Sequence, residues 1–220
     1  ITERFRYLPI HLYYLLNPRK FLSMADRFGS NLTAFVIAVG LIYMGFSTFF
    51  IPLPAYFKTV IGLNDGVIYF LFIVNSLSSA LFYRKASGLI KKAGPVKVLE
   101  SSLFLRIVLL PAIIVPFLFI QSVTLRLIIV SLFFALIGTS WALINVSNLV
   151  VTSRLSPSSI KGQVFGVYNG ISGLSAVFGS LIGGYVAKSG SYLTTFLLAS
   201  LFISLGLVIV RKNIHEGILK

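Results

Sequence analysis

The sequence predicts an all-α membrane protein in which six transmembrane helices form two inverted three-helix repeats. The first reason is composition: 57% of the 220 residues are hydrophobic and only 11% are charged, whereas ordinary soluble domains carry about a quarter charged residues. The second is the presence of six apolar runs close to the roughly 20 residues that a helix needs to cross a bilayer. Together these observations exclude a soluble globular domain and a disordered chain.

The apolar runs predict the elements in chain order. We expect spanning helices at residues 32–53, 67–83, 99–119, 127–150, 163–187 and 192–210. The second run is short, so we expect that helix to borrow residues from its flanks. Pro111 and Pro116 predict a kink in the third helix, because proline removes a backbone hydrogen bond from a helix interior.

Residues 1–31 are predicted to form a cytoplasmic linker, and residues 211–220 a cytoplasmic tail. Within the linker, an apolar segment between Arg6 and Arg19 is too short to span a membrane. It fits a helix lying on the membrane surface, and it fits equally well an ordered linker packed on the cytoplasmic helix ends. Because the first residue is Ile, we expect the chain to be a fragment or a processed piece.

The basic residues predict the orientation of the chain. The net charge is +14, from 19 Lys and Arg against 5 Asp and Glu. Most of the basic residues lie before the first run, between the second and third, between the fourth and fifth, and after the sixth. Since Lys and Arg concentrate in cytoplasmic loops, we expect both termini to be cytoplasmic, in a multi-pass protein of the cell membrane. No nucleic-acid partner is expected, because the charges alternate with the spans instead of forming one patch.

The two halves of the chain share one layout. Residues 32–119 and 127–210 each contain three runs, and each block has a connection of about a dozen residues after its first helix. Three is an odd number, so the second block must enter the membrane upside down relative to the first. Inverted three-helix repeats of this kind are an established plan for transporters.

The fifth run carries an apolar face, which includes Ile171 and which we expect to face lipid, and a face of small residues. Small residues let helix backbones approach closely, and they also let helices slide; the glycines alone do not separate these two roles. The positions predicted to serve packing or conformational change are Gly162, Gly166, Gly170, Gly173, Gly179, Gly183 and Gly184.

Polar and aromatic side chains recur on stripes of the first, second, fourth and fifth runs. Polar groups at membrane depth face a bundle interior or a watery cavity, and an Asn amide there serves either a substrate or a neighbouring helix. The candidate cavity residues are Tyr43, Asn75, Trp141, Asn145 and Asn169, to which Arg106 is added.

Arg106 has two interpretations. It stands seven residues after Leu99, about 10 Å along a helix, so its long side chain could snorkel toward the cytoplasmic face. We prefer that interpretation. The alternative is a contact with an anion or carboxylate inside a cavity.

Several chemistries are missing from the spans. The chain has no Cys, and its acidic residues and histidines all lie outside the apolar runs. A mid-membrane carboxylate or imidazole proton relay is therefore excluded within this chain. We expect no metal, no cofactor and no enzymatic activity.

Residues 156–187, SPSSIKGQVFGVYNGISGLSAVFGSLIGGYVA, resemble the tenth-to-eleventh helix region of the major facilitator superfamily. In that family a Lys/Arg-Gly pair leads into a glycine-rich helix that ends in Gly-Gly. Residues 87–94, SGLIKKAG, resemble the family's cytoplasmic loop motif Gly-x-Leu-x-Asp-Arg-x-Gly. Leu89, Lys92 and Gly94 fit that motif, whereas Ser87 replaces its first Gly and Lys91 replaces its Asp with the opposite charge.

The resemblance implies the carboxy-terminal six-helix half, with its preceding linker, of a twelve-helix secondary transporter. It implies a cavity lined by the first, second, fourth and fifth helices. The partners it implies are the lipid bilayer, a missing amino-terminal six-helix half and a small-molecule substrate. Uptake by a permease and efflux both remain open.

Two functions compete. The first is transport of a small solute by alternating access. A cavity lined by polar stripes from four helices would favour it. The second is a non-transporting six-helix scaffold or assembly partner. Polar helix faces whose groups all bond to one another would favour that function. A membrane-embedded enzyme ranks last, because the spans lack a catalytic motif.

Overall fold

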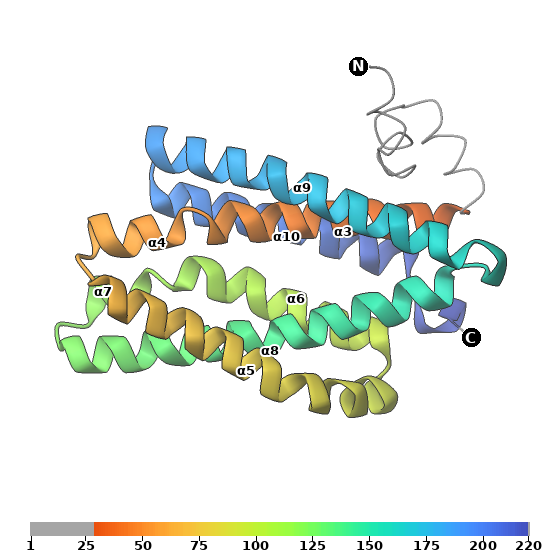
Figure 1. Ribbon diagram of the computed structural model, residues 1–220, viewed down its shortest axis with the longest axis horizontal. Helices are drawn as coiled ribbons and strands as arrows, with labels where there is room; N and C mark the ends of the chain where they lie inside the picture. The colour runs from red at the N-terminus through yellow and green to blue at the C-terminus, as the bar shows by residue number, and fades with distance from the viewer. Residues whose placement is uncertain (1–28, 220) are drawn as a thin grey trace, which may run out of the picture.

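The computed structural model describes residues 29–219, which are helical throughout apart from short connections (Figure 1). The predicted linker at 1–31 therefore lies almost entirely outside the described residues. Six segments of the described part are long and apolar enough to cross a membrane. They are Ser30–Val60, Asp65–Ala93, Pro95–Phe119, Val123–Leu155, Ser158–Ser189 and Tyr192–Asn213, which confirms the six predicted spans.

The first segment is α3 (Ser30–Phe50), followed by α4 (Leu53–Ala55) and the π-helical turn η2 (Tyr56–Val60). The second is α5 (Asp65–Ala93), and the third is α6 (Pro95–Ala112) followed by α7 (Val115–Phe119). The break between α6 and α7 lies beside Pro111, where the kink was predicted. The last three are α8 (Val123–Leu155), α9 (Lys161–Ser189) behind the 3-10 turn η3 (Ser158–Ile160), and α10 (Tyr192–Asn213). The 3-10 turn η4 (Glu216–Leu219) ends the described part.

Most helices extend past the apolar runs. The largest difference is α5, which has 29 residues and continues into the SGLIKKAG segment. That segment was predicted to be a loop, but residues 87–93 form the last two turns of α5 and Gly94 is the cap that follows them. An apolar run ends at the first charged residues, but the helix does not have to end there. Lys and Arg are good helix formers, and their long side chains reach water from a helix end. The expected dozen-residue connections are wrong for the same reason, since α4, η2 and η3 fill much of them.

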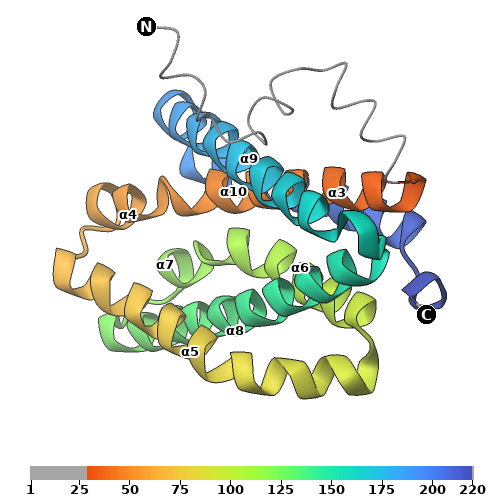
Figure 2. The ribbon, with the colours of Figure 1, turned by 45° about the vertical axis from the view of Figure 1, so that its right-hand side comes forward.

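The six long helices form two groups, seen as an upper and a lower layer in Figures 1 and 2. In one group α3 packs against α9 and α10, and in the other α8 packs against α5 and α6. The groups meet mainly where α6 contacts α10, where Ser200 Oγ donates to the Ile107 carbonyl at 3.1 Å.

This pairing follows from the inverted repeat. The first helix of each three-helix block packs on the second and third helices of the other block. Exchanging the blocks therefore maps each principal helix contact onto another. The two repeats are thus interlocked rather than stacked side by side, and the inverted-repeat prediction is confirmed at the level of helix pairing.

Small residues of several helices make these pairings close. A Cβ added at Gly179 or Gly183 of α9 would overlap the α3 backbone at Met44 or Thr48. On the other side of α3, a Cβ at Gly45 would lie 2.7 Å from the Ala199 carbonyl oxygen of α10. In a bilayer, such close backbone contact supplies the packing energy that hydrophobic exclusion supplies in water.

Candidate functional site

A cavity of about 290 Å³ lies between the two helix groups. It is lined by residues of α3, α5, α6 and α8, together with Ile51 just after α3. The lining residues are Tyr43, Phe46, Ser47, Phe50, Ile51, Phe72, Asn75, Arg106 and Trp141. Its walls are therefore mainly aromatic, with a few polar groups.

The structure brings four of the six predicted cavity residues together, namely Tyr43, Asn75, Trp141 and Arg106. Asn145 lies behind the wall, where its Oδ1 accepts a hydrogen bond from the Tyr43 hydroxyl at 3.3 Å. Asn169 is exposed on α9 and does not line this cavity. The resemblance implied a cavity lined by the fifth helix, which is α9. Within this chain the cavity is lined by α6 instead.

Arg106 does not snorkel, so the interpretation preferred from sequence is wrong. The residue is only 1% exposed. Its Nε donates to Ser140 Oγ at 3.0 Å and its Nη2 donates to the Ile137 carbonyl at 2.9 Å, both on α8. The physical reason is that α8 crosses beside α6 at this depth and offers two acceptors, so the side chain bonds to the neighbouring helix instead of extending along its own.

Aromatic rings complete the Arg106 environment. The guanidinium carbon lies 4.4 Å from the Phe46 ring centroid, 5.2 Å from Trp141 and 5.8 Å from Phe50. Phe46 and Trp141 are themselves in edge contact, with centroids 5.5 Å apart. Ring faces attract cations, so these walls stabilise a buried positive charge.

Two polar atoms of the cavity residues have no hydrogen-bond partner within the described part of the chain. They are Arg106 Nη1 and Asn75 Oδ1, and both are buried. One is a charged donor and the other an acceptor. Because buried polar groups are normally paired, these two atoms are the least satisfied polar groups of the cavity wall.

The Tyr43 hydroxyl has the opposite character, because protein groups satisfy it. It donates to Asn145 Oδ1 and lies 3.4 Å from the Tyr168 hydroxyl of α9. Asn145 Nδ2 in turn donates to the Trp141 carbonyl at 3.1 Å. This network joins α3, α8 and α9, so Asn145 acts as a link between helices.

Sequence reasoning did not select Phe46, Ser140 or Tyr168 as site residues. Phe46 stands three residues after Tyr43, a spacing that places both on one helix face, so periodicity could have found it. No sequence pattern marked Ser140 or Tyr168. Ser140 contacts Arg106 of α6 and Tyr168 contacts Tyr43 of α3, and both partners are distant in sequence.

The glycines of α9 divide into two sets. Gly179 and Gly183 lie against α3, while a Cβ at Gly162, Gly173 or Gly184 would meet open space; Gly166 and Gly170 are partly buried. Ile171 was expected to face lipid, but it packs against α3 beside Gly40 and near Leu32 and Val36. That part of the face assignment is wrong because α3 crosses the apolar side of α9 at its amino-terminal end.

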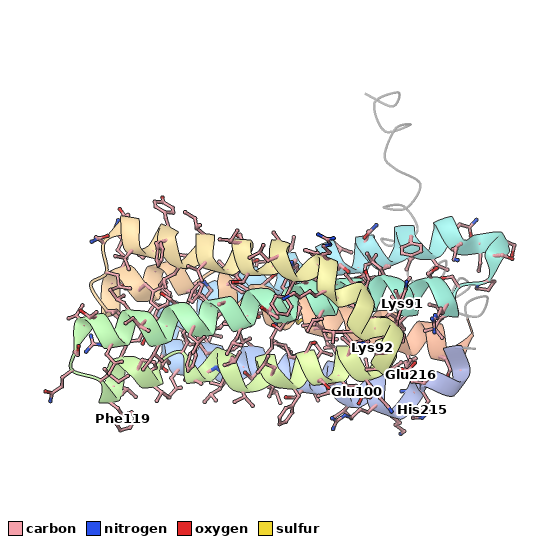
Figure 3. All side chains as sticks on the ribbon, turned by 90° about the horizontal axis from the view of Figure 1, so that it is seen from below. Lys91, Lys92, Glu100, Phe119, His215 and Glu216 are labelled. Carbon is pink, nitrogen blue, oxygen red and sulfur yellow. The ribbon has the colours of Figure 1, made fainter. Side chains whose placement is uncertain are left out.

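The loop-motif residues lie at one end of the bundle, opposite Phe119, and gather with the carboxy-terminal segment (Figure 3). Gly94 joins α5 to α6 with a φ of +89°, a conformation that favours glycine. The Glu216 carboxylate accepts hydrogen bonds from the backbone N–H groups of Val96 at 2.8 Å and Lys97 at 3.3 Å. It thereby caps the amino terminus of α6. Lys91 and Arg154 line a second cavity, of about 450 Å³, beside Gly94 and Glu216.

The three acidic residues within the described part all lie away from the 290 Å³ cavity. Asp65 pairs with Lys58 at 2.9 Å, Glu100 pairs with Arg211 at 3.5 Å, and Glu216 caps α6. Among residues 29–219, no group of His, Cys, Asp or Glu side chains is arranged to hold a metal ion.

Comparison with known families gives one clear result. The family model described as Major Facilitator Superfamily matches residues 26–216. A comparison with curated proteins gives no match. The family match covers the linker end and all six spans, and it agrees with the interlocked inverted repeats and the cavity between them. The chain belongs to the Major Facilitator Superfamily.

Proposed function

We propose that this chain forms the carboxy-terminal half of a twelve-helix transporter of the cell membrane, moving a small solute by alternating access. Members of its family move solutes across membranes, and the chain is a multi-pass membrane protein of that family. The 290 Å³ cavity is proposed to be this half's share of the substrate site.

One observation carries the proposal: four helices surround a cavity whose wall holds two buried polar atoms without protein partners. The chain itself does not pair these atoms, and each unpaired group in an apolar interior costs about 1–3 kcal/mol. A substrate that pairs with them recovers this cost. The cavity also lies between the two helix groups of a half that would rock as one body against the other half in alternating access.

A scaffold or assembly role is favoured by a different observation. The Tyr43, Asn145 and Tyr168 side chains satisfy one another, as expected for helices that only need to stay together. The same contacts are compatible with a transporter, so they do not decide between the two functions.

Cysteine accessibility distinguishes transport from scaffolding. This chain contains no native Cys, so Ser47→Cys adds a single thiol at the cavity wall. The variant would be made in the full protein, in a background without other cysteines, and treated with a membrane-impermeant thiol reagent in right-side-out and inverted vesicles. Alternating access predicts labelling from both sides.

Two controls define the sides. Ser122→Cys, between α7 and α8, should react from outside only, and Lys91→Cys, near the carboxy-terminal end of α5, from the cytoplasmic side only. Labelling of Ser47→Cys from one side alone, with both controls behaving as expected, would contradict alternating access.

A further inference from the structure

The cavity has a charge as well as a shape. Arg106 lines it and is almost fully buried. Its Nε and Nη2 are bonded to α8, but Nη1 has no protein partner within the described residues. A guanidinium stays protonated in proteins. The cavity wall therefore holds a positive charge with an unfilled donor, Nη1, which has almost no accessible surface of its own.

This charge is not neutralised by the described part of the chain. The carboxylates of Asp65, Glu100 and Glu216 are engaged elsewhere, at the ends of the bundle. The aromatic rings of Phe46 and Trp141 support the cation but carry no net charge. A buried charge is stable when it is paired, so the missing counter-charge is the main chemical feature of the site.

The remaining walls constrain the shape and polarity of a ligand. Phe46, Phe50, Phe72 and Trp141 present apolar ring surfaces, and Asn75 Oδ1 offers an unpaired acceptor. A volume of about 290 Å³ lies just below the roughly 300–1,000 Å³ range of ligand pockets. The site therefore fits a small, flat molecule with one donor group.

We propose that this cavity binds a small organic anion, whose anionic group pairs with Arg106 Nη1 once a small turn of the guanidinium exposes that atom, and whose flat apolar body lies between the aromatic rings. A donor group on the ligand would bond Asn75 Oδ1. The proposal rests on the transport function proposed above and names the substrate class of that site.

The first test measures the charge of the cavity with the Ser47→Cys protein in lipid nanodiscs. Labelling rates are compared for two methanethiosulfonate reagents of similar size, one carrying a sulfonate and one a trimethylammonium group. The ratio of the anionic to the cationic rate should exceed that of free cysteine. Arg106→Met should lower this ratio by about tenfold or more, because the two charges interact at close range in a low dielectric.

Two further variants keep this test decisive. Arg106→Lys retains the charge and should preserve the anionic preference if Arg106→Met proves unstable. Arg126→Met is a matched control, because Arg126 also donates two hydrogen bonds to a carbonyl, that of Ile120, and lies 5.6 Å from the Phe117 ring. It lies outside the cavity and should leave the ratio unchanged. A ratio like that of free cysteine, or no reaction with either reagent, overturns the proposal.

The second test uses matched ring compounds in the same protein. Benzoate, benzamide and benzylamine share a ring and differ in charge, and each is tested for protection of the Ser47→Cys thiol from the neutral reagent iodoacetamide. Benzoate should protect at concentrations about tenfold lower than benzamide, since hydrogen bonds to charged groups exceed neutral ones, and Arg106→Met should remove that difference. Equal protection by all three overturns the proposal.

These outcomes are separable from those of the transport test. Both tests measure the charge preference of the cavity and do not require transport. If the thiol prefers the anionic reagent but is labelled from one side only, the cavity is an anion-binding site in a protein that does not transport. If the thiol is labelled from both sides but prefers the cationic reagent, the transport proposal is supported and the organic-anion proposal is rejected.

Discussion

At the scale of single residues, the site is defined by whether buried polar atoms have protein partners. Asn75 and Asn145 are both asparagines within a membrane span, and from sequence they looked alike. Asn145 is bonded to Tyr43 and to the Trp141 carbonyl, whereas Asn75 Oδ1 is unpaired on the cavity wall. The same residue type therefore has two different hydrogen-bonding states, which are set by neighbours on other helices.

The two asparagines should respond oppositely to truncation. Asn145→Ala should lower the free energy of unfolding by about 1 kcal/mol or less, the size of measured interhelical hydrogen bonds in membranes, and leave the anionic labelling preference of the Ser47→Cys thiol unchanged. Asn75→Ala should have little effect on stability and weaken protection by a ligand that donates a hydrogen bond. Thermal unfolding and protection of the same thiol, measured on both variants, check this. Loss of stability in Asn75→Ala alone would reverse the assignment.

At the scale of elements, the helices are positioned by a few close contacts and end groups. On α9, Gly179 and Gly183 meet α3 backbone while Gly173 faces open space. The side chains of Asn64 and Ser191 accept hydrogen bonds at the starts of α5 and α10. Glu216 does the same for α6 from a distant part of the chain, which ties the segment after α10 to the junction of α5 and α6.

Alanine substitution along α9 should separate the two sets of glycines. Gly179→Ala and Gly183→Ala should lower the melting temperature, because a methyl group would force α9 away from α3. Gly173→Ala should be neutral or slightly stabilising, since alanine is favoured over glycine in a helix by about 1 kcal/mol. Destabilisation by Gly173→Ala would place another helix against that face.

The α5–α6 junction offers a double-mutant test. Gly94→Ala should destabilise the protein for two reasons, a positive-φ backbone conformation costing about 1–3 kcal/mol and an overlap with the Glu216 carboxylate. Glu216→Ala should itself cost about 0.5–2 kcal/mol by removing the cap. The double variant should be less destabilised than the sum of the two, because the overlap is gone. Additive effects would mean that the two residues do not interact.

At the scale of the whole molecule, the two interlocked repeats together form the 290 Å³ cavity. Each block's first helix packs on the other block's second and third helices, so neither block is a separate unit. The cavity lies where the two resulting groups face each other, and the family match spans both.

The orientation of the whole molecule is a prediction based on its basic residues. The Ser122→Cys and Lys91→Cys variants test it, because the two positions belong to opposite ends of the bundle. Reaction of Lys91→Cys from outside the cell, together with protection of Ser122→Cys, would invert the proposed orientation.

The sequence alone determined the features that depend on local composition. Six spans, the kink at Pro111, the inverted repeats and the absence of acids within the apolar runs all follow from which residues stand near one another in the chain. The helix ends were less well predicted, as α5 illustrates, because hydropathy detects contact with lipid and not the continuation of a helix into water.

Only the tertiary structure decided which way side chains point. The sequence favoured a snorkelling Arg106, but in the structure this side chain bonds to Ser140 and the Ile137 carbonyl of α8. The sequence also indicated that Ile171 faces lipid, but α3 packs against it. Asn169 was expected in the cavity, but the rotation of α9 leaves it exposed. The physical reason is that lipid and protein interior are equally apolar, so hydrophobicity does not set the rotation of a helix about its axis. Contacts between residues far apart in the chain set that rotation.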